Sequence, residues 1–430
     1  MTTTKQRALA GLPSFGLASL LAASALAQPD PSAPVPATTA TFPAVAPAAV
    51  PLSPPPIVPP PASTVPVPPP PVVPPPAPQA DAPPKQLAVG SGGGYFQPGA
   101  LLQFWIDWSH QDMTAPGKTV PVGDEKTFQF RLRRAELRVK GDIVPKRIAY
   151  NVMIDPARAL EVNQVKAAPA SGTDPVLVAQ PPVGADGKFS PLSVLADYFI
   201  TFQTDYADVS VGQFKVPLSY EGSNSASKIL FPERAPVARL YGDKRDIGLR
   251  VEKKLWEHFG YSAGIFNGTG QNKLDDDTEK DGALRLEGYF EGLTLAGVGY
   301  TTLGKREKSS RDRLEADLKY DAHGIYVVAE YIHGWDTKGG GKASEGHGAY
   351  VEVAYTLFDH LQPMVRVGDV EPVMHVPGDH YWHYEGGVAW LFRKNEAKLQ
   401  LAASHFAPTT PTPPTNPERT QVILAAQAGF

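Results

Sequence analysis

The region from Lys85 to Phe430 has no uninterrupted apolar run near the ~20 residues of a membrane helix, but hydrophobic residues recur in it at every second position. Such alternation places two sets of side chains on opposite faces of a β-strand. Most of the alternating segments have about the ~9–11 residues that a tilted strand needs to cross a bilayer. We delimit sixteen of them, an even number: Ala100–Ser109, Thr127–Gly141, Lys146–Asp155, Leu192–Gln203, Ala207–Val216, Arg245–Trp256, Phe259–Asn267, Ala283–Glu291, Thr294–Leu303, Asp312–Asp321, Ile325–Gly334, His347–Leu357, Leu361–Gly368, His380–Phe392, Glu396–His405 and Gln421–Phe430.

The connections between these segments alternate between long and short. The long ones include Gln111–Lys126, Pro156–Pro191, Pro217–Lys244, Gly268–Gly282, Trp335–Gly346, Asp369–Asp379 and Phe406–Thr420. The short ones include Asp142–Pro145, Thr204–Tyr206, Glu257–His258, Gly292–Leu293, Ala322–Gly324, Phe358–His360 and Arg393–Asn395. Long extracellular loops and tight periplasmic turns are typical of an up-and-down membrane barrel, whereas a soluble sandwich has no reason to sort its loops in this way. The predicted fold is therefore all-β, a sixteen-stranded antiparallel transmembrane β-barrel, with a soluble all-β fold as the alternative.

Apolar and charged residues separate onto two faces within the segments. Phe128 and Phe130 fall on one face and Arg131 on the other, and the phase slips once, at Arg133 and Arg134, as a β-bulge allows. Because a charge on the lipid face costs a few kcal/mol at the bilayer midplane, we expect the charged face to line water. Aromatic residues near the segment ends suit girdles at the two membrane interfaces. They are Trp256, Tyr289, Phe290, Phe358, Tyr381, Trp382, Trp390 and Phe392.

The first 84 residues differ in composition from the rest of the chain. Residues 1–27 combine Lys5 and Arg7 with an apolar stretch and the small-x-small site Ala25-Leu26-Ala27, which indicates a signal peptide; the alternative is a membrane anchor. Residues 28–84 hold 24 of the 46 prolines and are predicted to form a proline-rich periplasmic linker, either a plain spacer or a segment that contacts peptidoglycan. Residues 85–430 form the predicted barrel. The chain has no cysteine, so no disulfide can hold it together.

The last segment ends in Phe430, which follows apolar residues at every second position. A terminal aromatic residue on an alternating last strand is similar to the assembly signal of bacterial outer-membrane barrels. We therefore expect Phe430 to be recognised by the barrel-assembly machinery.

The long connection Pro217–Lys244 between the fifth and sixth segments is a candidate for narrowing the lumen. Its run from Ile229 to Pro232 is too apolar for a solvated outer loop, so we expect the connection to fold inward against the barrel wall. Its bases are Lys228, Arg234, Arg239 and Lys244, with Arg245 next, against the acids Glu221, Glu233 and Asp243. A positive excess in a narrow constriction of low dielectric favours anions. We expect these bases to dominate because most inward-facing acids should lie on the more distant wall.

The stretch VGQFKVPLSYEGSNSASKILFPERAPVARLYGDKRDIGLRVEKKL, with RLRRAELRVKGDIVPKRIAYNVMIDPAR upstream, resembles the phosphate-selective porin O/P family. The resemblance covers about Gly94 to Phe430. It implies a sixteen-stranded, trimeric outer-membrane channel whose third extracellular loop folds into the pore, and a ladder of arginines and lysines that binds anions there. The bases in the matching regions are Arg131, Arg133, Arg134, Lys215, Lys228, Arg234, Arg239 and Arg245. Unlike such a ladder, this chain also has inward-facing acids, namely Glu136, Glu252, Glu287, Glu315, Asp317, Glu352 and Glu385.

These observations predict a porin of the bacterial outer membrane, a diffusion channel for small hydrophilic solutes that prefers anions and takes phosphate or polyphosphate as candidate solutes. The alternatives are a structural or adhesive barrel tethered by the proline-rich stalk, and a barrel enzyme, for which the spacing locates no Ser/His/Asp site. We interpret Asp275, Asp277, Glu279 and Asp281 as a solvated loop, with a calcium site as the alternative. We interpret His375, His380 and His383 as rim residues, with a transition-metal site that includes Asp379 as the alternative. We expect no cofactor, metal or nucleic-acid partner. The expected macromolecular partners are outer-membrane lipid, lipopolysaccharide and further copies of the chain in a homotrimer.

Overall fold

The computed structural model describes residues 87–89, 93–114, 121–161, 194–275, 277–304, 309–338, 344–374, 376, 378–409 and 418–430. The predicted signal peptide and proline-rich linker lie outside the described residues. The wall strands are β2 (Gly94–Thr114), β3 (Pro121–Val144), β4 (Ile148–Ile154), β5 (Leu195–Gln203), β6 (Asp208–Lys215), β7 (Arg245–Leu255), β8 (Phe259–Phe266), β9 (Lys280–Phe290), β10 (Leu293–Leu303), β11 (Ser309–Ala322), β12 (Ile325–Lys338), β13 (Ser344–Tyr355), β14 (Leu361–Glu371), β15 (Tyr381–Arg393), β16 (Ala397–Pro408) and β17 (Arg419–Gly429). Each predicted segment corresponds to one of these strands, in the same order.

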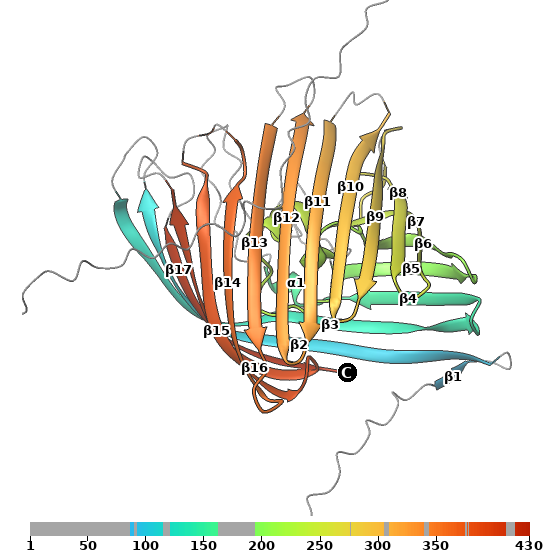
Figure 1. Ribbon diagram of the computed structural model, residues 1–430, viewed down its shortest axis with the longest axis horizontal. Helices are drawn as coiled ribbons and strands as arrows, with labels where there is room; N and C mark the ends of the chain where they lie inside the picture. Colours follow the sequence, from blue (N-terminus) through green and yellow to red (C-terminus); the bar gives the residue numbers. More distant parts are fainter. Residues whose placement is uncertain are drawn as a thin grey trace, which may run out of the picture. The chain divides into compact units, whose positions relative to one another are not determined.

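The strands form a closed antiparallel barrel. Every strand from β2 to β17 pairs with its neighbours in sequence, and β17 pairs with β2 through a register that includes Leu424↔Ile106, which closes the ring. Figure 1 shows β10 to β17 following one another around the wall. Closure leaves no open strand edge, as a sheet in lipid requires. The predicted sixteen-stranded antiparallel barrel is confirmed.

The ends of the barrel differ from the prediction in two places. The strands β2 and β3 have 21 and 24 residues and continue through most of Gln111–Lys126, which we expected to be a loop. Cross-strand contacts explain the extension, because Ser109 and Thr127 share a 2.7 Å hydrogen bond and their backbone ladder continues beyond them. A short strand β1 (Leu87–Val89), which the sequence did not indicate, pairs with the start of β2.

The turns at the other end are tight. Between β11 and β12, His323 and Gly324 both have positive φ, at 55° and 78°. Positive φ at both central residues is the geometry of a type I′ turn, whose twist matches that of the flanking strands. Such turns let successive strands reverse without a loop.

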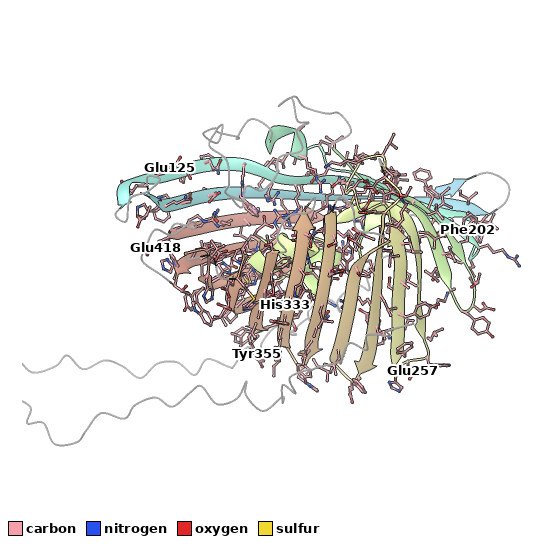
Figure 2. The ribbon with its side chains drawn as sticks, turned by 90° about the horizontal axis from the view of Figure 1, so that it is seen from above. Glu125, Phe202, Glu257, His333, Tyr355 and Glu418 are labelled. Carbon is pink, nitrogen blue, oxygen red and sulfur yellow. The ribbon has the colours of Figure 1, made fainter. Side chains whose placement is uncertain are left out.

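The two faces of the wall have the predicted polarity. Phe128 and Phe130 are 65% and 73% exposed, whereas Glu352 and Arg366 are almost completely buried. Figure 2 shows side chains projecting from both faces of the strands. The register of β2 on β3 shifts between Gln103 and Phe104, opposite Arg133, so the predicted bulge is confirmed. The exposed face of the closed barrel is thus apolar and the buried face polar, the inverse of a soluble protein.

Most of the predicted girdle aromatics are exposed near strand ends, among them Trp256, Phe358 and Phe392. Tyr381 is an exception, since it is only 4% exposed and packs beside Phe406. Its assignment to the girdle was wrong because it stands at an inward position of β15, one residue out of phase with Trp382. Among the described residues, no helix has the length and apolar character needed to cross a membrane.

We expect replacement of Phe430 by Ser to lower the yield of folded barrel. The Phe430 N–H and C=O both bond to Ala100 on β2, at 3.0 and 3.2 Å, and its side chain is 79% exposed and free for recognition. The measurement is the heat-modifiable fraction in membranes. Phe392→Ser is the matched control, because Phe392 is another exposed aromatic residue, 66% exposed, near the end of β15 and not at the end of the chain. An equal yield from both variants would remove the special role of Phe430.

Candidate functional site

The connection between β6 and β7, here called the β6–β7 segment (Pro217–Lys244), is ordered and largely buried. It contains a one-turn helix α2 (Tyr220–Ser223) and a π-helix η3 (Ala238–Gly242). Ser219 caps α2 by accepting a 3.0 Å hydrogen bond from the Gly222 N–H. The apolar residues that suggested an inward fold are buried, with Phe231 at 0% exposure and Ile229 at 2%.

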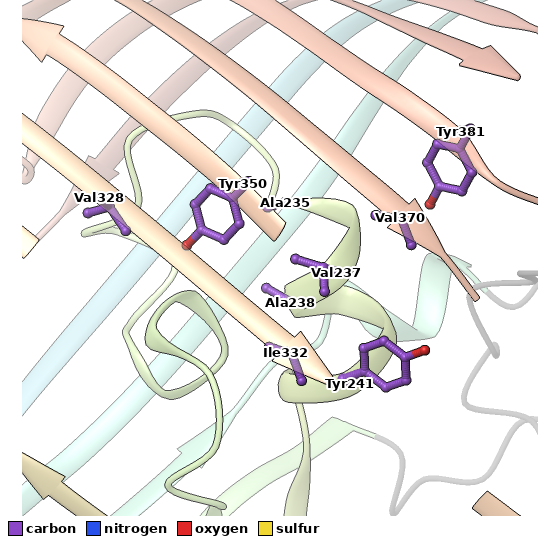
Figure 3. Packing of buried hydrophobic residues seen from close by; sticks show 9 residues of the cluster. All are labelled: Ala235, Val237, Ala238, Tyr241, Val328, Ile332, Tyr350, Val370 and Tyr381. Atoms are coloured by element: carbon purple, nitrogen blue, oxygen red, sulfur yellow. The ribbon is translucent and has the colours of Figure 1, made fainter. Parts of the chain in front are cut away.

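Three hydrophobic clusters join the β6–β7 segment to the buried face of the wall, one of them through Leu218 and residues of β8 to β10. The other two involve more of the segment. The first unites residues around η3 with side chains of β12 to β15 (Figure 3): Ala235, Val237, Ala238, Tyr241, Val328, Ile332, Tyr350, Val370 and Tyr381. The second unites Leu230 and Phe231 with β13, β14 and β16: Ala354, Met364 and Ala402. Burial of this apolar area supplies the non-directional part of the attachment.

Polar side chains of the wall hold the backbone of the segment. Four of them donate to carbonyl groups between residues 226 and 230, at 2.6 to 3.4 Å. The pairs are Gln103 with Ala226, Gln427 with Ser227, Lys398 with Ile229 and Gln400 with Leu230. Because the donors come from β2, β16 and β17, the segment's contacts extend along the wall beyond the strands beneath η3. These bonds satisfy carbonyl groups that burial would otherwise leave unpaired.

Arg366 on β14 is a fully buried charge at the centre of three carboxylates. Its guanidinium contacts three carboxylates, those of Glu221 at 2.6 Å, Glu352 at 2.8 Å and Glu385 at 2.9 Å. Glu221 belongs to the β6–β7 segment, while the other two belong to the wall. The sequence placed Glu352 and Glu385 on the inward face but did not single out Arg366.

Three of the eight predicted bases surround Glu233. Arg133 donates to its carboxylate at 2.7 and 3.0 Å, and the shortest contacts of Arg134 and Arg239 are 3.3 and 3.4 Å. Burial by itself would raise the pKa of Glu233, but attraction to the three guanidinium groups holds that pKa well below its ordinary value. The carboxylate is therefore ionised at neutral pH.

Two bases, Arg234 of the segment and Lys215 at the end of β6, donate to backbone carbonyls of the segment. Arg234 donates to the backbone carbonyls of Glu221 and Asn224, at 2.8 and 3.0 Å. Lys215 donates to the carbonyls of Gly222, at 2.9 Å, and Asn224. Both bases are therefore engaged by the segment's own backbone.

Asp243 joins Arg234 and Arg239. Its carboxylate is 2.8 Å from Arg239 and 3.5 Å from Arg234. Burial would raise its pKa, and the neighbouring bases hold the pKa well below the ordinary value. Four arginines, Arg133, Arg134, Arg234 and Arg239, thus share two carboxylates within one group, which we call the arginine cluster.

The other three predicted bases lie outside the arginine cluster. Arg131 stacks over Trp105, with 4.5 Å between its guanidinium carbon and the ring centroid. Arg245 pairs with Asp197 at 2.7 Å. Lys228 is exposed at a cavity of about 620 Å³ that also reaches Arg138.

The expectation that inward-facing acids lie far from the segment was wrong. The wall acids Glu315 and Glu330 accept from the Ser219 and Tyr220 N–H groups of the segment at 2.5 and 3.2 Å, and Arg366 joins Glu352 and Glu385 to Glu221. The physical reason is that a buried charge needs a partner, so the bases and acids of a packed interior come together.

Two further arginines, not singled out from the sequence, continue the basic lining. Arg138 lies on β3, the strand that carries Arg131 and Arg133, and its side chain is 36% exposed. Arg250 on β7 stacks over Phe214 at 4.5 Å and pairs with Glu252 at 2.8 Å. Their inward position in the alternation was the available signal.

Within the described ranges, no three His, Asp or Glu side chains are arranged to hold a metal ion. His380 pairs with Asp369 at 2.5 Å, and His383 is 3% exposed and 4.5 Å from the Phe406 ring. The interpretation of His383 as a rim residue was wrong, because it faces inward on β15. His375 lies outside the described residues.

Comparison with known proteins agrees with the fold. The structure is similar to an outer-membrane protein OmpT of Vibrio cholerae with a deleted loop L8, at 11% identity and a TM-score of 0.54, over 78% of this chain and 99% of that one. It is also similar to an anion-selective porin from Comamonas acidovorans (9% identity, TM-score 0.54, 78% and 100% covered) and to the outer-membrane channel DcaP of Acinetobacter baumannii (12%, 0.53, 80% and 100%). No curated protein sequence matches the chain.

The family model described as phosphate-selective porin O and P matches residues 102–315, which run from β2 into β11. The match includes the whole β6–β7 segment and all eight predicted bases, from Arg131 to Arg245. Family and fold together identify a channel of the bacterial outer membrane rather than an enzyme. The chain belongs to the phosphate-selective porin O and P family.

Proposed function

We propose that the protein is an anion-preferring diffusion channel in which the β6–β7 segment lies inside the barrel and forms the constriction. The support for this position is the set of wall residues that the segment contacts. They come from β2, β3 and from β12 to β17, and each of them belongs to the buried face of its strand. These strands form a continuous arc of the closed barrel, and contacts with their buried faces support a path of the segment through the interior.

The observation that carries the anion preference is the arginine cluster. Four guanidinium groups share the carboxylates of Glu233 and Asp243, which leaves two positive charges in excess. Where water is scarce, the effective dielectric is low and the attraction of such an excess for an anion is strong. Arg239 is the accessible member, since its side chain is 36% exposed while that of Arg234 is 4% exposed.

Four of the inward-facing acids of the wall are covered. The side chains of Glu315, Asp317 and Glu352 have no exposed surface, and that of Glu385 is 6% exposed. A permeating ion therefore meets Arg239, Arg131 and Arg138 more readily than these acids. The covering of these four acids supports a positive lumen in a chain whose overall charge is negative, while the side chains of Glu252 and Glu287 are 39% and 27% exposed.

Phosphate is the candidate solute. The family model is described as phosphate-selective, and a structurally similar porin of Comamonas acidovorans is described as anion-selective. Guanidinium groups bind phosphate oxygens through two parallel hydrogen bonds, which suits a cluster of arginines.

The proposed assembly is a homotrimer in the outer membrane. One structurally similar OmpT of Vibrio cholerae is described in a trimer form. Lipid and lipopolysaccharide would contact the exposed apolar face, the assembly machinery would bind β17, and the proline-rich segment would approach peptidoglycan.

The function is tested by phosphate block of chloride current. We expect millimolar phosphate to reduce the single-channel chloride current of the wild type in planar bilayers, because both anions compete for the arginine cluster. Arg239→Gln should weaken the block and move the reversal potential toward that of cations. Both changes are expected because the substitution removes the accessible guanidinium of the arginine cluster.

The matched control is Arg393→Gln. Arg393 is also an exposed arginine and pairs with Glu396 at 2.9 Å, but it is the last residue of β15, beside a short turn. It should leave the phosphate block unchanged. Equal effects of Arg239→Gln and Arg393→Gln would show that selectivity follows overall charge and not the constriction.

A further inference from the structure

We infer that Arg366 is a positioning residue that fixes the β6–β7 segment against the wall and thereby sets the width and selectivity of the pore. This inference rests on the proposed function, because it assumes that the segment is the constriction. The guanidinium of Arg366 has no exposed surface, so a permeating anion does not touch it. Its effect on permeation must pass through the segment.

Arg366 binds both halves of the segment. It bonds to Glu221 in α2, and it also donates to the backbone carbonyl of Glu233 at 3.0 Å. The ring of Phe231 lies under the guanidinium, with 4.5 Å between the guanidinium carbon and the ring centroid. One wall side chain thus contacts residues ten or more positions apart in the segment.

Glu221 connects this contact to the fold of the segment. One carboxylate oxygen accepts from Arg366 at 2.6 Å and the other accepts from the Ala235 N–H at 2.5 Å. Arg234, next to Ala235, donates in turn to the Glu221 carbonyl at 2.8 Å. The two halves of the segment are therefore tied to each other at the place where Arg366 ties them to the wall.

The charges around Arg366 explain why removing it should release the segment. Three buried carboxylates share this guanidinium, and two of them belong to the wall. Without the guanidinium, Glu221 would face Glu352 and Glu385 in a site that excludes water, where like charges repel strongly. Moving α2 away from the wall would relieve that repulsion.

The test is single-channel recording from Arg366→Met, which keeps an apolar side chain over Phe231 but removes the charge. We expect the conductance to rise roughly twofold and the reversal potential to move toward zero, because the constriction widens and the arginine cluster disperses. Heat-modifiability establishes that the recorded barrels are folded. Arg366→Met with wild-type conductance and reversal potential would overturn the inference.

Arg285→Met is the matched control. Arg285 is also buried among three carboxylates, with Asp317 at 2.7 Å, Glu287 at 2.8 Å and Glu315 at 3.4 Å, but all three belong to the wall. Glu315 also accepts from the Ser219 N–H of the segment at 2.5 Å, a bond that Arg285→Met leaves in place. If Arg366 acts through the segment, Arg285→Met should leave the conductance near that of the wild type. The same increase in both variants would mean that any buried ion cluster has this effect, and would overturn the positioning role.

An engineered disulfide supplies a rescue. A Cβ built at Gly348 on β13 would lie 3.0 Å from the Cβ of Val237 and 2.9 Å from the carbonyl oxygen of Asp369, so the backbone must shift by a few tenths of an ångström to reach the 3.5–4.5 Å Cβ separation of a disulfide. The chain has no cysteine to interfere. We expect Arg366→Met combined with Val237→Cys and Gly348→Cys to regain wild-type conductance when oxidised and to lose it when reduced. The same conductance in the oxidised and reduced states would contradict the inference.

If Arg366→Met does not fold, Glu221→Gln gives the same test from the other side. It removes only the segment's charge from the cluster and should raise the conductance, whereas an unchanged conductance would overturn the inference. A wild-type pore that prefers cations would refute the proposed anion preference, but it would leave the conductance effect of Arg366→Met as a separate result.

Discussion

Replacing Val365 with Arg should lower the free energy of unfolding of the barrel by about 2–4 kcal/mol, the cost of an arginine at the bilayer midplane. Val365 is 57% exposed, lies near the middle of β14, and is flanked by the buried residues Met364 and Arg366. Its side chain therefore points away from the polar interior. Equilibrium unfolding in guanidinium chloride with lipid vesicles measures the loss.

Val144→Arg is the matched control for this substitution. Val144 is 39% exposed and is the last residue of β3, beside a short turn. An arginine there reaches the interface, where the cost is about 0–1 kcal/mol. Equal losses at the two positions would mean that the exposed face does not contact lipid.

Replacing Arg234 and Arg239 together with Ala should move the reversal potential strongly toward cations and weaken phosphate block. The double replacement removes two of the four guanidinium groups of the arginine cluster and leaves Asp243 without its two contacts within 4 Å in that cluster. A fixed charge in a narrow pore acts strongly because little water screens it. Arg234 also holds the carbonyls of Glu221 and Asn224, so the conductance should rise as well.

Glu233→Gln should move the reversal potential in the opposite direction. It removes one of the two carboxylates of the arginine cluster and leaves the contacting arginines in place. The pair of variants is therefore a test of sign that does not depend on absolute conductance. Shifts in the same direction would show that the arginine cluster does not control selectivity.

The barrel could be predicted from the sequence because its determinants are local. Alternation along each strand and the lengths of the connections located every strand from β2 to β17, and the phase slip at Arg133 and Arg134 located the bulge. The ends of β2 and β3 were missed because polar cross-strand pairs such as Gln111↔Glu125 and Asp112↔Asp124 carry no hydrophobic signal.

The pairing of charges in the interior could not be predicted, because it depends on contacts between distant parts of the chain. Arg366 and Glu221 are separated by 145 positions in the sequence. The local pattern of β14 does not distinguish Arg366 from any other inward-facing charge. One signal was available. Inward acids on neighbouring strands, such as Glu352 and Glu385, require a cation among them, and Arg366 lies on the strand between theirs.

The burial of the inward-facing acids determines how strongly they oppose anion permeation. Counted from the sequence, Glu315, Asp317, Glu352 and Glu385 oppose an anion channel. In the fold they are buried, so their charges are balanced locally by Arg285 and Arg366 and are hidden from the lumen. Net charge along the chain is therefore a poor guide to the charge that a permeating ion meets.

The most direct test of the central claim is the reversal potential of the wild-type pore under a potassium chloride gradient across a planar bilayer. The accessible arginines and the covered acids predict a reversal potential of the sign that chloride permeation gives. We expect that potential to move toward zero when phosphate occupies the arginine cluster. A potential of the sign given by potassium permeation would contradict the account.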